Sequence, residues 1–347
     1  MKIALLTDAW EPQVNGVVRT WQNVIAECEK LGHEFAVIHP GMFKTIAAPK
    51  YPEIRLSLRP YPKARRVLDE FQPDAIHIAT EGPVGRAGRR YCLKHQLPFT
   101  SSYHTQFPHY LKAYFGIPKW ATYKFIRWFH GKAESTLAPT KTVVDELHQN
   151  GLPKAKTWSR GADTELFRPQ EKTLFNDLPR PIFLYAGRVA VEKNIEAFLQ
   201  LDLPGTKVVV GDGPAKPKLE KQFPAPGTVW AGYQFGEDLA RHYASADVFV
   251  FPSLTDTFGV VMLEANASGL PVAAYPVTGP IDVVDPGVTG VLNQDLRQAC
   301  LDAVHVNPQD CRDYALKNSW SCCAEIVLNT IAEIHRPVSQ VTVAAPT

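Results

Sequence analysis

The chain has 347 residues, of which 45% are hydrophobic and 21% are charged, with a formal net charge of +2. This balance is typical of a globular protein, and the length suits two domains of similar size better than one hydrophobic core. No apolar run reaches the roughly 18–20 residues of a membrane-spanning helix, and the N-terminal apolar stretch ends at Asp8, too early for a signal peptide. We therefore expect a cytoplasmic protein.

The six cysteines form no C-x-x-C pair, and no histidine stands near them at the spacing of metal ligands. We expect reduced, mostly buried thiols at these positions: Cys28, Cys92, Cys300, Cys311, Cys322 and Cys323.

Short apolar runs alternate with helix-like stretches along the chain. In the first half the pattern predicts strands at 3–7, 35–39, 75–79, 99–103 and 136–140, and helices at 17–31, 84–95 and 141–150. In the second half it predicts strands at 182–187, 207–211, 228–232, 248–253 and 272–276, and helices at 194–201, 237–245 and 260–268. This rhythm favours parallel α/β sheets covered by helices on both faces.

The rhythm breaks at a polar, proline-rich stretch, 167–181, which we interpret as a linker between domains. We expect two Rossmann-like, doubly wound parallel-sheet domains, 1–168 and 169–318, with a helix at about 319–336 that packs back on the first. Two such sheets that face each other leave a cleft between the carboxyl ends of their strands, where open α/β folds bind ligands.

The small net charge hides an asymmetry between the two halves. Residues 1–165 carry 23 Lys and Arg against 15 Asp and Glu, whereas residues 166–347 carry 14 against 20. No acidic residue lies between Glu81 and Glu134, and that stretch holds nine Lys and Arg. A basic surface of this kind attracts polyanions, either anionic lipid or nucleic acid.

The strongest motif is PSLTDTFGVVMLEANASGLPV at 252–272. Phe258, Gly259 and Val260 stand where a helix begins, and the backbone N–H groups of a helix N-terminus suit a diphosphate. Glu264 offers a carboxylate to a ribose diol, and Asp256 is placed to face a sugar. The alternative is that Asp256 only caps the helix and Glu264 is solvated, although its neighbours in the helix are apolar.

A second motif is FLYAGRVAVEKNIEAFL at 183–199. Arg188 and Lys193 follow the carboxyl end of a predicted strand, where two cations can neutralise a pyrophosphate leaving group. The alternative is two ordinary surface cations. A third run, VVVGDGP at 208–214, places Gly211 in a glycine-rich turn after a strand, which is a weak signal by itself.

Two residues of the first half are candidates for the same cleft. Gly16 stands just before a predicted helix and lets backbone approach a phosphate or sugar, unless it is only a turn glycine. His104, in SSYHTQFPHY at 101–110, follows a predicted strand. A single histidine in such a position is either a cleft residue or a structural one.

Taken together and in this order, these segments resemble the retaining glycosyltransferases of family GT4, which have the GT-B fold. The resemblance covers nearly the whole chain. It implies that Arg188 and Lys193 contact the diphosphate of a nucleotide-sugar donor, that Glu264 holds its ribose, and that the backbone of 258–260 contacts phosphate. It also implies that His104 lies near the donor sugar, with the acceptor on the first domain and the donor on the second.

One position departs from the family pattern. The first glutamate of the E-x7-E motif is Asp256, one methylene shorter, which puts the contact to the sugar hydroxyls in doubt. No D-x-D motif occurs, and the Arg188/Lys193 pair makes a catalytic metal or other cofactor unnecessary. NGVVRT, SYHT and TDTFG resemble a subgroup with sulfoquinovosyl and other diacylglycerol glycosyltransferases and GDP-mannose-dependent mannosyltransferases.

The acid-free stretch includes a segment, 110–132, in which aromatic residues alternate with cations. This composition fits a segment that lies on anionic lipid, and Arg59–Arg66 extends the basic patch. The alternative is a helix pair whose aromatics fill the core of the first domain. Nucleic acid is not expected as a partner, because no nucleic-acid-binding motif occurs.

The sequence thus predicts transfer of a hexose from UDP-glucose, UDP-glucuronate or GDP-mannose to a lipid such as diacylglycerol, at the inner face of the membrane. Two alternatives stay open. One is a soluble enzyme of the same family with a sugar or small-molecule acceptor, and the other is a nucleotide-sugar-binding protein or epimerase without transfer activity.

Overall fold

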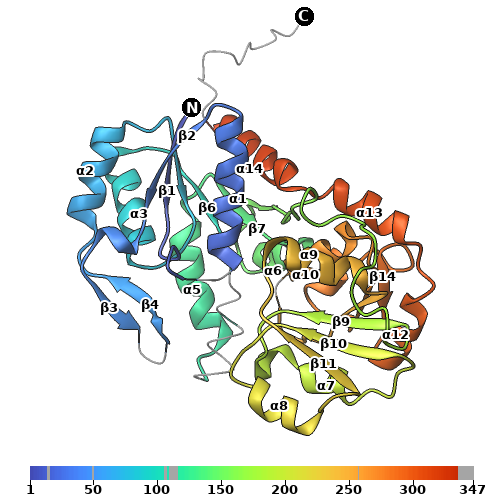
Figure 1. Cartoon of the computed structure of the whole chain (residues 1–347). Coiled ribbons are helices and arrows are strands. Elements are labelled where there is room, and N and C mark those ends of the chain that lie inside the picture. The colour runs from blue at the N-terminus through green and yellow to red at the C-terminus, as the bar shows by residue number, and fades with distance from the viewer. Residues whose placement is uncertain (14–15, 49–50, 105–107, 109–115, 257, 335–347) are drawn as a thin grey trace, which may run out of the picture. The chain divides into compact units, whose positions relative to one another are not determined.

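The computed structural model describes residues 1–13, 16–48, 51–104, 108, 116–256 and 258–334 (Figure 1). They form two compact units, one of Met1–Ser159 with the C-terminal residues from Cys323, and one of Arg160–Cys322. The chain thus passes between units after Ser159, nine residues before the boundary expected from the sequence, and again after Cys322.

The first unit is built on six parallel strands in the order β2-β1-β5-β6-β7-β8. Their bounds are β1 (Lys2–Leu6), β2 (Glu34–Ile38), β5 (Ala75–Ile78), β6 (Thr100–Ser102), β7 (Ser135–Ala138) and β8 (Ala155–Thr157). An antiparallel hairpin outside this sheet joins β3 (Thr45–Ala48) to β4 (Tyr51–Ser57). The helical elements are α1 (Gly16–Lys30), η1 (Pro40–Met42), α2 (Tyr61–Phe71), α3 (Pro83–His95), α5 (Lys119–His130) and α6 (Lys141–Gln149).

The last helix, α14 (Trp320–Ile334), begins in the second unit and continues in the first. Within the first unit, Trp158 Nε1 donates to Cys323 O at 3.1 Å and Lys156 Nζ pairs with Glu333 Oε2 at 2.6 Å. These contacts tie the C-terminal helix to the end of the β8 strand.

Local sequence explains why the helices of the first unit start where they do. Helix α6 is capped by Thr140, whose side chain accepts from Val143 N. The N-terminus of α3 is capped by a residue that is distant in sequence, because the Asp8 carboxylate accepts hydrogen bonds from Val84 N at 2.8 Å and Gly85 N at 3.2 Å. Burial raises the pKa of Asp8, although these backbone bonds oppose the shift.

The second unit is built on six parallel strands in the order β11-β10-β9-β12-β13-β14. Their bounds are β9 (Ile182–Ala186), β10 (Thr206–Val210), β11 (Thr228–Gly232), β12 (Val248–Phe251), β13 (Val272–Ala274) and β14 (Gly290–Leu292). The helical elements are η2 (Val191–Lys193), α7 (Ile195–Leu199), α8 (Lys216–Gln222), α9 (Gly236–Ser245), α10 (Val260–Ala267), α11 (Pro280–Val283), α12 (Leu296–Ala303) and α13 (Pro308–Leu316).

The strand order fixes where a ligand binds in each sheet. In the second unit the chain runs outward from β9 through β10 to β11, and then returns to the other side of β9 with β12. The chain therefore leaves β9 and β12 in opposite directions along the sheet, and the carboxyl edge at this switch point is the usual ligand position in doubly wound folds. In the first unit the same switch falls between β1 and β5.

The doubly wound parallel sheets predicted from the sequence are confirmed in both units. Helices α2, α11, α12 and α13 and the β3–β4 hairpin were not predicted, because their apolar positions are few and their sequences are broken by proline or charge. The helix expected at about 319–336 corresponds to α14. Within the described residues, no helix is both long and apolar enough to span a membrane.

Candidate active site

The carboxyl edge at the switch point of the second unit collects most of the residues singled out by sequence. Arg188 and Lys193 follow β9, and the segment from Asp256 to Val260 follows β12. Because β9 and β12 are hydrogen-bonded neighbours, their carboxyl ends bring the two loops together. The Asn194 side chain joins them directly, since its Nδ2 donates to Pro252 O at 3.0 Å.

Glycines allow the neighbouring loops to lie backbone against backbone. A Cβ on Gly211 would lie 1.9 Å from the carbonyl oxygen of Gly187, and one on Gly213 would lie 2.3 Å from that of Val189. These separations exclude any side chain, so the loop after β10 packs directly on the loop after β9. The glycine-rich turn is thus required by packing, and the predicted donor contact of Gly211 stays a prediction.

Lys193 and Asp256 form an ion pair at the centre of this edge. Lys193 Nζ contacts Asp256 Oδ1 at 2.6 Å, with about a quarter of each side chain exposed (27% and 24%). The second carboxylate oxygen, Oδ2, is buried and has no hydrogen-bond partner among the described residues. The interpretation of Lys193 as an ordinary surface cation is therefore wrong, because it is half-buried and salt-bridged.

Arg188 lies beside this pair but extends outward. Its side chain is 62% exposed, and its nearest described acid is Glu192, with Nη1 to Oε1 at 4.0 Å. Tyr185 OH donates to Arg188 O at 2.9 Å and holds the backbone of the loop. Burial raises the pKa of Tyr185, as do the charges of Asp256 and Glu192, so this hydroxyl stays protonated. Arg188 is therefore an exposed cation on a hydrogen-bonded loop backbone.

Helix α10 begins at the N-cap Gly259, whose φ is +88°. A Cβ here would lie 2.8 Å from Met262 Cε and 2.9 Å from Phe251 Cζ, so glycine is required on both counts. Phe258 is buried in the core and Val260 opens the helix. Asp256 is not the N-cap, which rules out that alternative. The helix N-terminus faces the carboxyl edge, as an anion site needs.

Glu264 is a buried acid in the second turn of α10. It is 4% exposed, and its Oε2 accepts a hydrogen bond from Tyr243 OH at 3.3 Å. The alternative of a solvated helix residue is therefore wrong. Burying a carboxylate is costly unless it is hydrogen-bonded, and the bond from Tyr243 offsets part of this cost.

The structure adds one cation that sequence reasoning missed. Lys216, in the first turn of α8, contacts Asp212 Oδ2 at 3.3 Å, and its side chain is 17% exposed. Gly213 N donates to Asp212 Oδ1 at 2.7 Å, and this bond, with that of Lys216, lowers the pKa of Asp212. The lysine directly after the glycine-rich turn was a usable signal in the sequence.

In the first unit Gly16 and His104 both lie at the carboxyl edge of the sheet. Gly16 opens α1, and apart from its chain neighbours and the backbone of its own helix, none of the described atoms lies within 4 Å of the position a Cβ would take. His104 Nε2 accepts from Trp21 Nε1 at 3.1 Å, which orients the ring and leaves Nδ1 to carry the proton in the neutral form. This contact positions His104 structurally, and its role near the donor sugar stays a prediction.

A second polar cluster in the first unit is closed to solvent. His130 Nε2 lies 3.1 Å from Glu81 Oε1, and His130 Nδ1 lies 2.9 Å from Ser101 Oγ. All three residues are buried, so this order of acid, imidazole and hydroxyl meets no substrate. It links the C-terminus of α5 to the loop after β5.

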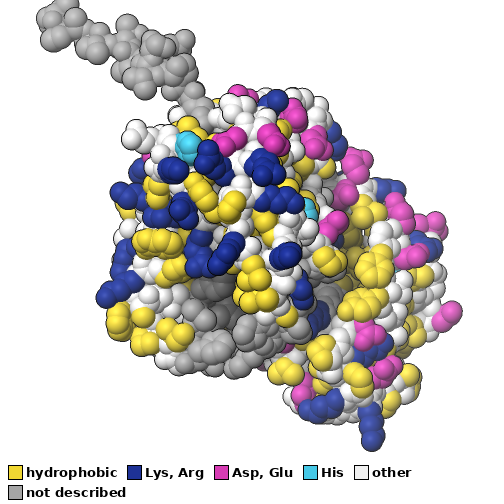
Figure 2. Space-filling model, turned by 90° about the vertical axis from the view of Figure 1, so that its left-hand side faces the viewer, with side chains coloured by type: hydrophobic (Ala, Val, Ile, Leu, Met, Phe, Trp, Pro, Cys, Tyr) yellow, Lys and Arg dark blue, Asp and Glu magenta, His cyan; other side chains and the backbone are white. Residues whose placement is uncertain are grey.

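Lys and Arg side chains gather among hydrophobic ones on one face of the molecule (Figure 2), and helices α2, α3 and α5 contribute basic and aromatic residues that stack on one another. Arg90 of α3 stacks on Tyr61 of α2, with 4.3 Å from its Cζ to the ring centroid. Arg89 of α3 stacks on Trp128 of α5, also at 4.3 Å, and donates to Trp128 O. These pairs join three helices into one surface, which we call the basic aromatic face.

Helix α5 divides its aromatic residues between this face and the core. Tyr123 and Phe129 are buried, whereas Trp120 is 63% and Trp128 50% exposed. The interpretation of core aromatics thus holds for the buried side of the helix, and contact of the exposed side with lipid stays a prediction. Residues 110–115 of the predicted segment lie outside the described residues.

No group of three or more His, Cys, Asp or Glu side chains suited to a metal ion occurs among the described residues.

The two doubly wound units and the cationic switch-point site define a glycosyltransferase of the GT-B class. Among solved structures, the Anabaena protein HepE in complex with UDP aligns with a TM-score of 0.73 at 16% identity, covering 96% of this chain and 100% of that one. Sucrose-phosphate synthase from Thermosynechococcus elongatus aligns with a TM-score of 0.75 at 20% identity, covering 96% and 98%. These likenesses establish the fold.

Sequence comparison identifies the family. Residues 14–166 match the model of Glycosyltransferase Family 4, and residues 180–306 match that of Glycosyl transferases group 1. A GDP-mannose-dependent alpha-mannosyltransferase of Mycobacterium tuberculosis is 31% identical over 318 residues, covering 84% of this chain and 83% of the relative. A sulfoquinovosyl transferase of Arabidopsis thaliana is 32% identical over 312 residues, covering 80% and 61%.

The chain belongs to glycosyltransferase family 4 and is a hexosyltransferase that uses a nucleotide sugar, as the sequence motifs predicted.

Proposed function

We propose that the protein transfers a hexose, with retention, from a nucleotide sugar to a lipid such as diacylglycerol at an anionic membrane surface. The donor is UDP-glucose, UDP-glucuronate or GDP-mannose. The main support for a lipid acceptor is the basic aromatic face of the first unit, where exposed tryptophans lie among cations.

The composition of this face suits the boundary between lipid headgroups and acyl chains. Trp120 and Trp128 supply large apolar bodies, and Lys124 stacks on Trp120 with 4.8 Å to the ring centroid. Stacked cations stay close to the rings while their charges reach lipid phosphates. Exposed Arg86, Arg66 and Lys63 on α3 and α2 add charge, each worth about 1 kcal/mol near an anionic surface.

The names of two relatives agree with a lipid acceptor. One is the sulfoquinovosyl transferase described above. The other is an alpha-monoglucosyldiacylglycerol synthase of Streptococcus pneumoniae, 26% identical over 350 residues, which covers 89% of this chain and 79% of the relative. With the absence of a membrane-spanning helix among the described residues, this supports a cytoplasmic protein bound peripherally to the inner face of the membrane.

For the donor, we propose that the diphosphate lies across the switch point of the second unit. Arg188 reaches it from the loop after β9, Lys193 from η2, and the backbone N–H groups of Phe258–Val260 from the start of α10. Glu264 accepts the ribose hydroxyls, since its buried carboxylate has lone pairs beyond the one Tyr243 uses. Gly211 lets the neighbouring turn approach the nucleotide.

Within the second unit, the sugar end of the donor would meet Asp256. The family resemblance implies that His104 and Gly16 of the first unit also contact the donor, and we propose them as further donor residues. As the bond from the anomeric carbon to the diphosphate oxygen breaks, Arg188, Lys193 and the helix N-terminus stabilise the negative charge of the leaving group. The acceptor hydroxyl oxygen bonds to the anomeric carbon on the same face, and its proton passes to the departing phosphate. These cations supply the charge stabilisation, so we propose no metal cofactor.

Vesicle flotation combined with a transfer assay tests the proposal. The protein should float with vesicles containing phosphatidylglycerol but not with pure phosphatidylcholine, and should glycosylate diacylglycerol in the anionic vesicles. If it transfers the hexose equally well to a soluble sugar acceptor and never floats, the lipid acceptor is wrong and a soluble enzyme of the same family remains. If the protein neither hydrolyses any of the three donors nor transfers a hexose from any of them, the whole proposal is wrong.

A further inference from the structure

The second unit has an open cavity of about 570 Å³ at the edge of its sheet opposite the candidate active site. Three of its lining residues, Pro181, Asp247 and Pro271, directly precede β9, β12 and β13. These strands are neighbours in the sheet, so the cavity floor is formed by their amino ends. The donor residues Arg188 and Asp256 follow the carboxyl ends of β9 and β12. The two sites therefore share strands but no lining residue.

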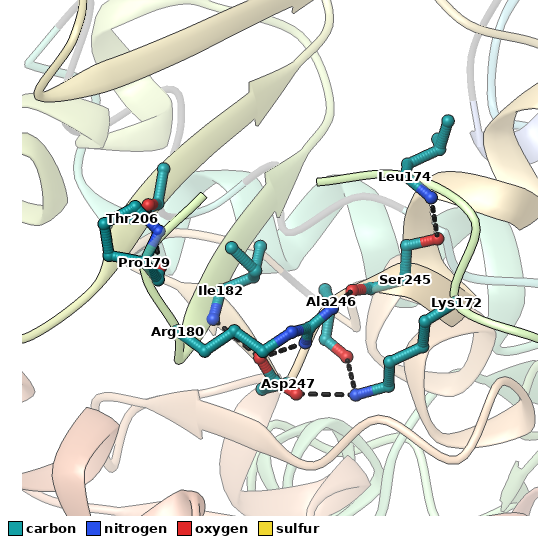
Figure 3. Close-up of polar contacts among 9 residues, drawn as sticks. All are labelled: Lys172, Leu174, Pro179, Arg180, Ile182, Thr206, Ser245, Ala246 and Asp247. Atoms are coloured by element: carbon teal, nitrogen blue, oxygen red, sulfur yellow. Dashed lines mark hydrogen bonds and ion pairs between the residues drawn. The ribbon is translucent and has the colours of Figure 1, made fainter. Parts of the chain in front are cut away.

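One side of the cavity is charged (Figure 3). Lys172 Nζ contacts Asp247 Oδ1 at 2.5 Å, and Arg180 Nη1 contacts Asp247 Oδ2 at 2.6 Å. Ile182 N also donates to Oδ2, at 2.7 Å. Burial alone would raise the pKa of Asp247, but these bonds and charges outweigh it and lower the pKa. Asp247 therefore stays ionised.

The cations of this cluster outnumber its acids. Lys172, Arg180 and Asp247 are the charged residues that line the cavity, which leaves one net positive charge. Lys172 also donates to Ala246 O at 3.0 Å and Arg180 to Ser245 O at 3.1 Å. The hydrogen bonds described use two of the three lysine N–H groups and two of the five of the guanidinium. Donors and charge are thus left over for an anionic head group.

Another part of the lining is apolar, which we call the apolar wall. It consists of Pro169, Leu270, Val304, Val306 and Pro308, which come from three separate segments of the unit. Gly269, with φ +74°, fits between two of them, because a Cβ there would lie 3.4 Å from Pro169 Cγ and 3.5 Å from Pro308 O. An inorganic anion would leave this wall unused, whereas a ligand with an apolar body would cover it.

We propose that this cavity is a second ligand site, and that it binds a small amphiphilic anion with a phosphate or carboxylate head against Lys172 and Arg180 and an apolar chain along Val304, Val306 and Leu270. The volume falls within the range of small-molecule sites, about 300–1,000 Å³. The cavity lies at the amino ends of β9 and β12, whose carboxyl ends carry the proposed donor loops, which gives the ligand a route to influence donor binding.

Calorimetric titration with hexyl phosphate tests the site, with inorganic phosphate and hexanol as probes of the head and the chain alone. The full-length protein should bind one hexyl phosphate, at least about tenfold more tightly than either fragment. Val306→Trp fills the apolar side without touching the cations and should weaken binding about tenfold or more. Leu316→Trp, on an exposed position of α13 that does not line the cavity, is the matched control and should change binding less than about twofold.

Equal affinity of the wild type and Val306→Trp would overturn the proposal, because the probe would then bind elsewhere, for example at the donor diphosphate site. The same conclusion follows if hexyl phosphate binds no more tightly than inorganic phosphate. If Val306→Trp does not fold, Val306→Cys provides a second measurement. Hexyl phosphate should slow the alkylation of this cysteine, followed by peptide mass spectrometry, and unchanged alkylation would contradict the site.

Discussion

Lys193 Nζ lies 2.6 Å from Asp256 Oδ1, so a cation expected to bind the donor diphosphate is paired with an acid expected to face the donor sugar. The pair joins the loops after β9 and β12 across the switch point of the second unit. Asp256 neutralises part of the charge that the diphosphate would meet. In the proposed donor complex, Lys193 contacts both the Asp256 carboxylate and the donor diphosphate. This shared contact would couple the phosphate end of the site to the sugar end.

The variant Asp256→Asn separates the effect of Asp256 on diphosphate binding, through Lys193, from its expected contact with the donor sugar. Removing the carboxylate charge leaves Lys193 available, so a nucleoside diphosphate should bind as tightly as before or up to about tenfold more tightly. Turnover should fall about 10–100-fold, because the sugar loses a charged hydrogen-bond acceptor. Isothermal titration and initial rates measure the two effects separately.

Glu192→Gln is the matched control for that experiment. Glu192 is another acid near the site, but its contact with Arg188 is long, at 4.0 Å, and both side chains are well exposed. Exposed pairs of this kind contribute about 0–1 kcal/mol. Wild-type turnover in Asp256→Asn, or an equal loss in Glu192→Gln, would remove Asp256 from the site.

Glu264 and Tyr243 differ in the effect expected from their substitution. Glu264→Gln keeps the size of the side chain but weakens its acceptance of two ribose hydroxyls, and should raise the donor KM about tenfold or more. Tyr243→Phe removes the hydrogen bond at 3.3 Å and should lower the free energy of unfolding by about 1 kcal/mol, with the donor KM changed less than about threefold. If both variants alter stability alike and neither alters KM, Glu264 is only a structural acid.

His77 makes the stability of the first unit depend on pH. The imidazole is fully buried between Thr100 Oγ1 and Ser102 Oγ, each at 2.7 Å. Burial, assisted by the neighbouring His130, lowers its pKa to about 3. Between about pH 3 and pH 6.5, His77 is therefore protonated in the unfolded chain, whose histidine pKa is about 6.5, but neutral in the folded chain. The contribution of neutral His77 is complete above about pH 6.5 and is lost as the pH falls toward 3.

Urea unfolding at several pH values checks this sign. The wild type should lose more stability than His77→Gln between pH 7 and pH 4, roughly where unfolded histidine takes up its proton. His33→Gln is the comparison, since His33 lies near the surface and should leave the slope closer to that of the wild type. Parallel curves for the wild type and His77→Gln would refute the burial of a neutral imidazole.

The two exposed tryptophans of α5 are expected to carry the apolar part of membrane binding. Trp120→Ala/Trp128→Ala should lower partitioning onto anionic vesicles about tenfold or more, without loss of donor binding. Tyr233→Ala/Phe235→Ala provides the control, because these aromatics are as exposed but belong to the second unit. Equal effects of the two double variants in a sedimentation assay would show that exposed aromatic area, and not the basic aromatic face, drives binding.

The periodicity of apolar residues predicted the parallel sheets, because strands buried on both faces read as continuous apolar runs, as in IFLYA of β9. Motif spacing placed Arg188, Lys193 and Asp256 at one edge of one sheet. It did not predict that Lys193 and Asp256 contact each other, since that depends on how two loops 63 residues apart fold. The same limit applies to Lys172 and Asp247, which come from a stretch interpreted as a linker and from the start of β12.

The most direct test of the donor site compares ligands that differ only in phosphate. Arg188→Ala/Lys193→Ala should weaken binding of the preferred nucleoside diphosphate about 100-fold or more, as expected for loss of two charged contacts, and should leave the affinity for the parent nucleoside within about threefold of the wild type. Calorimetric titration of both ligands gives the two ratios. An equal loss for nucleoside and nucleoside diphosphate, or no loss for either, would contradict the placement of the diphosphate at the switch point of the second unit.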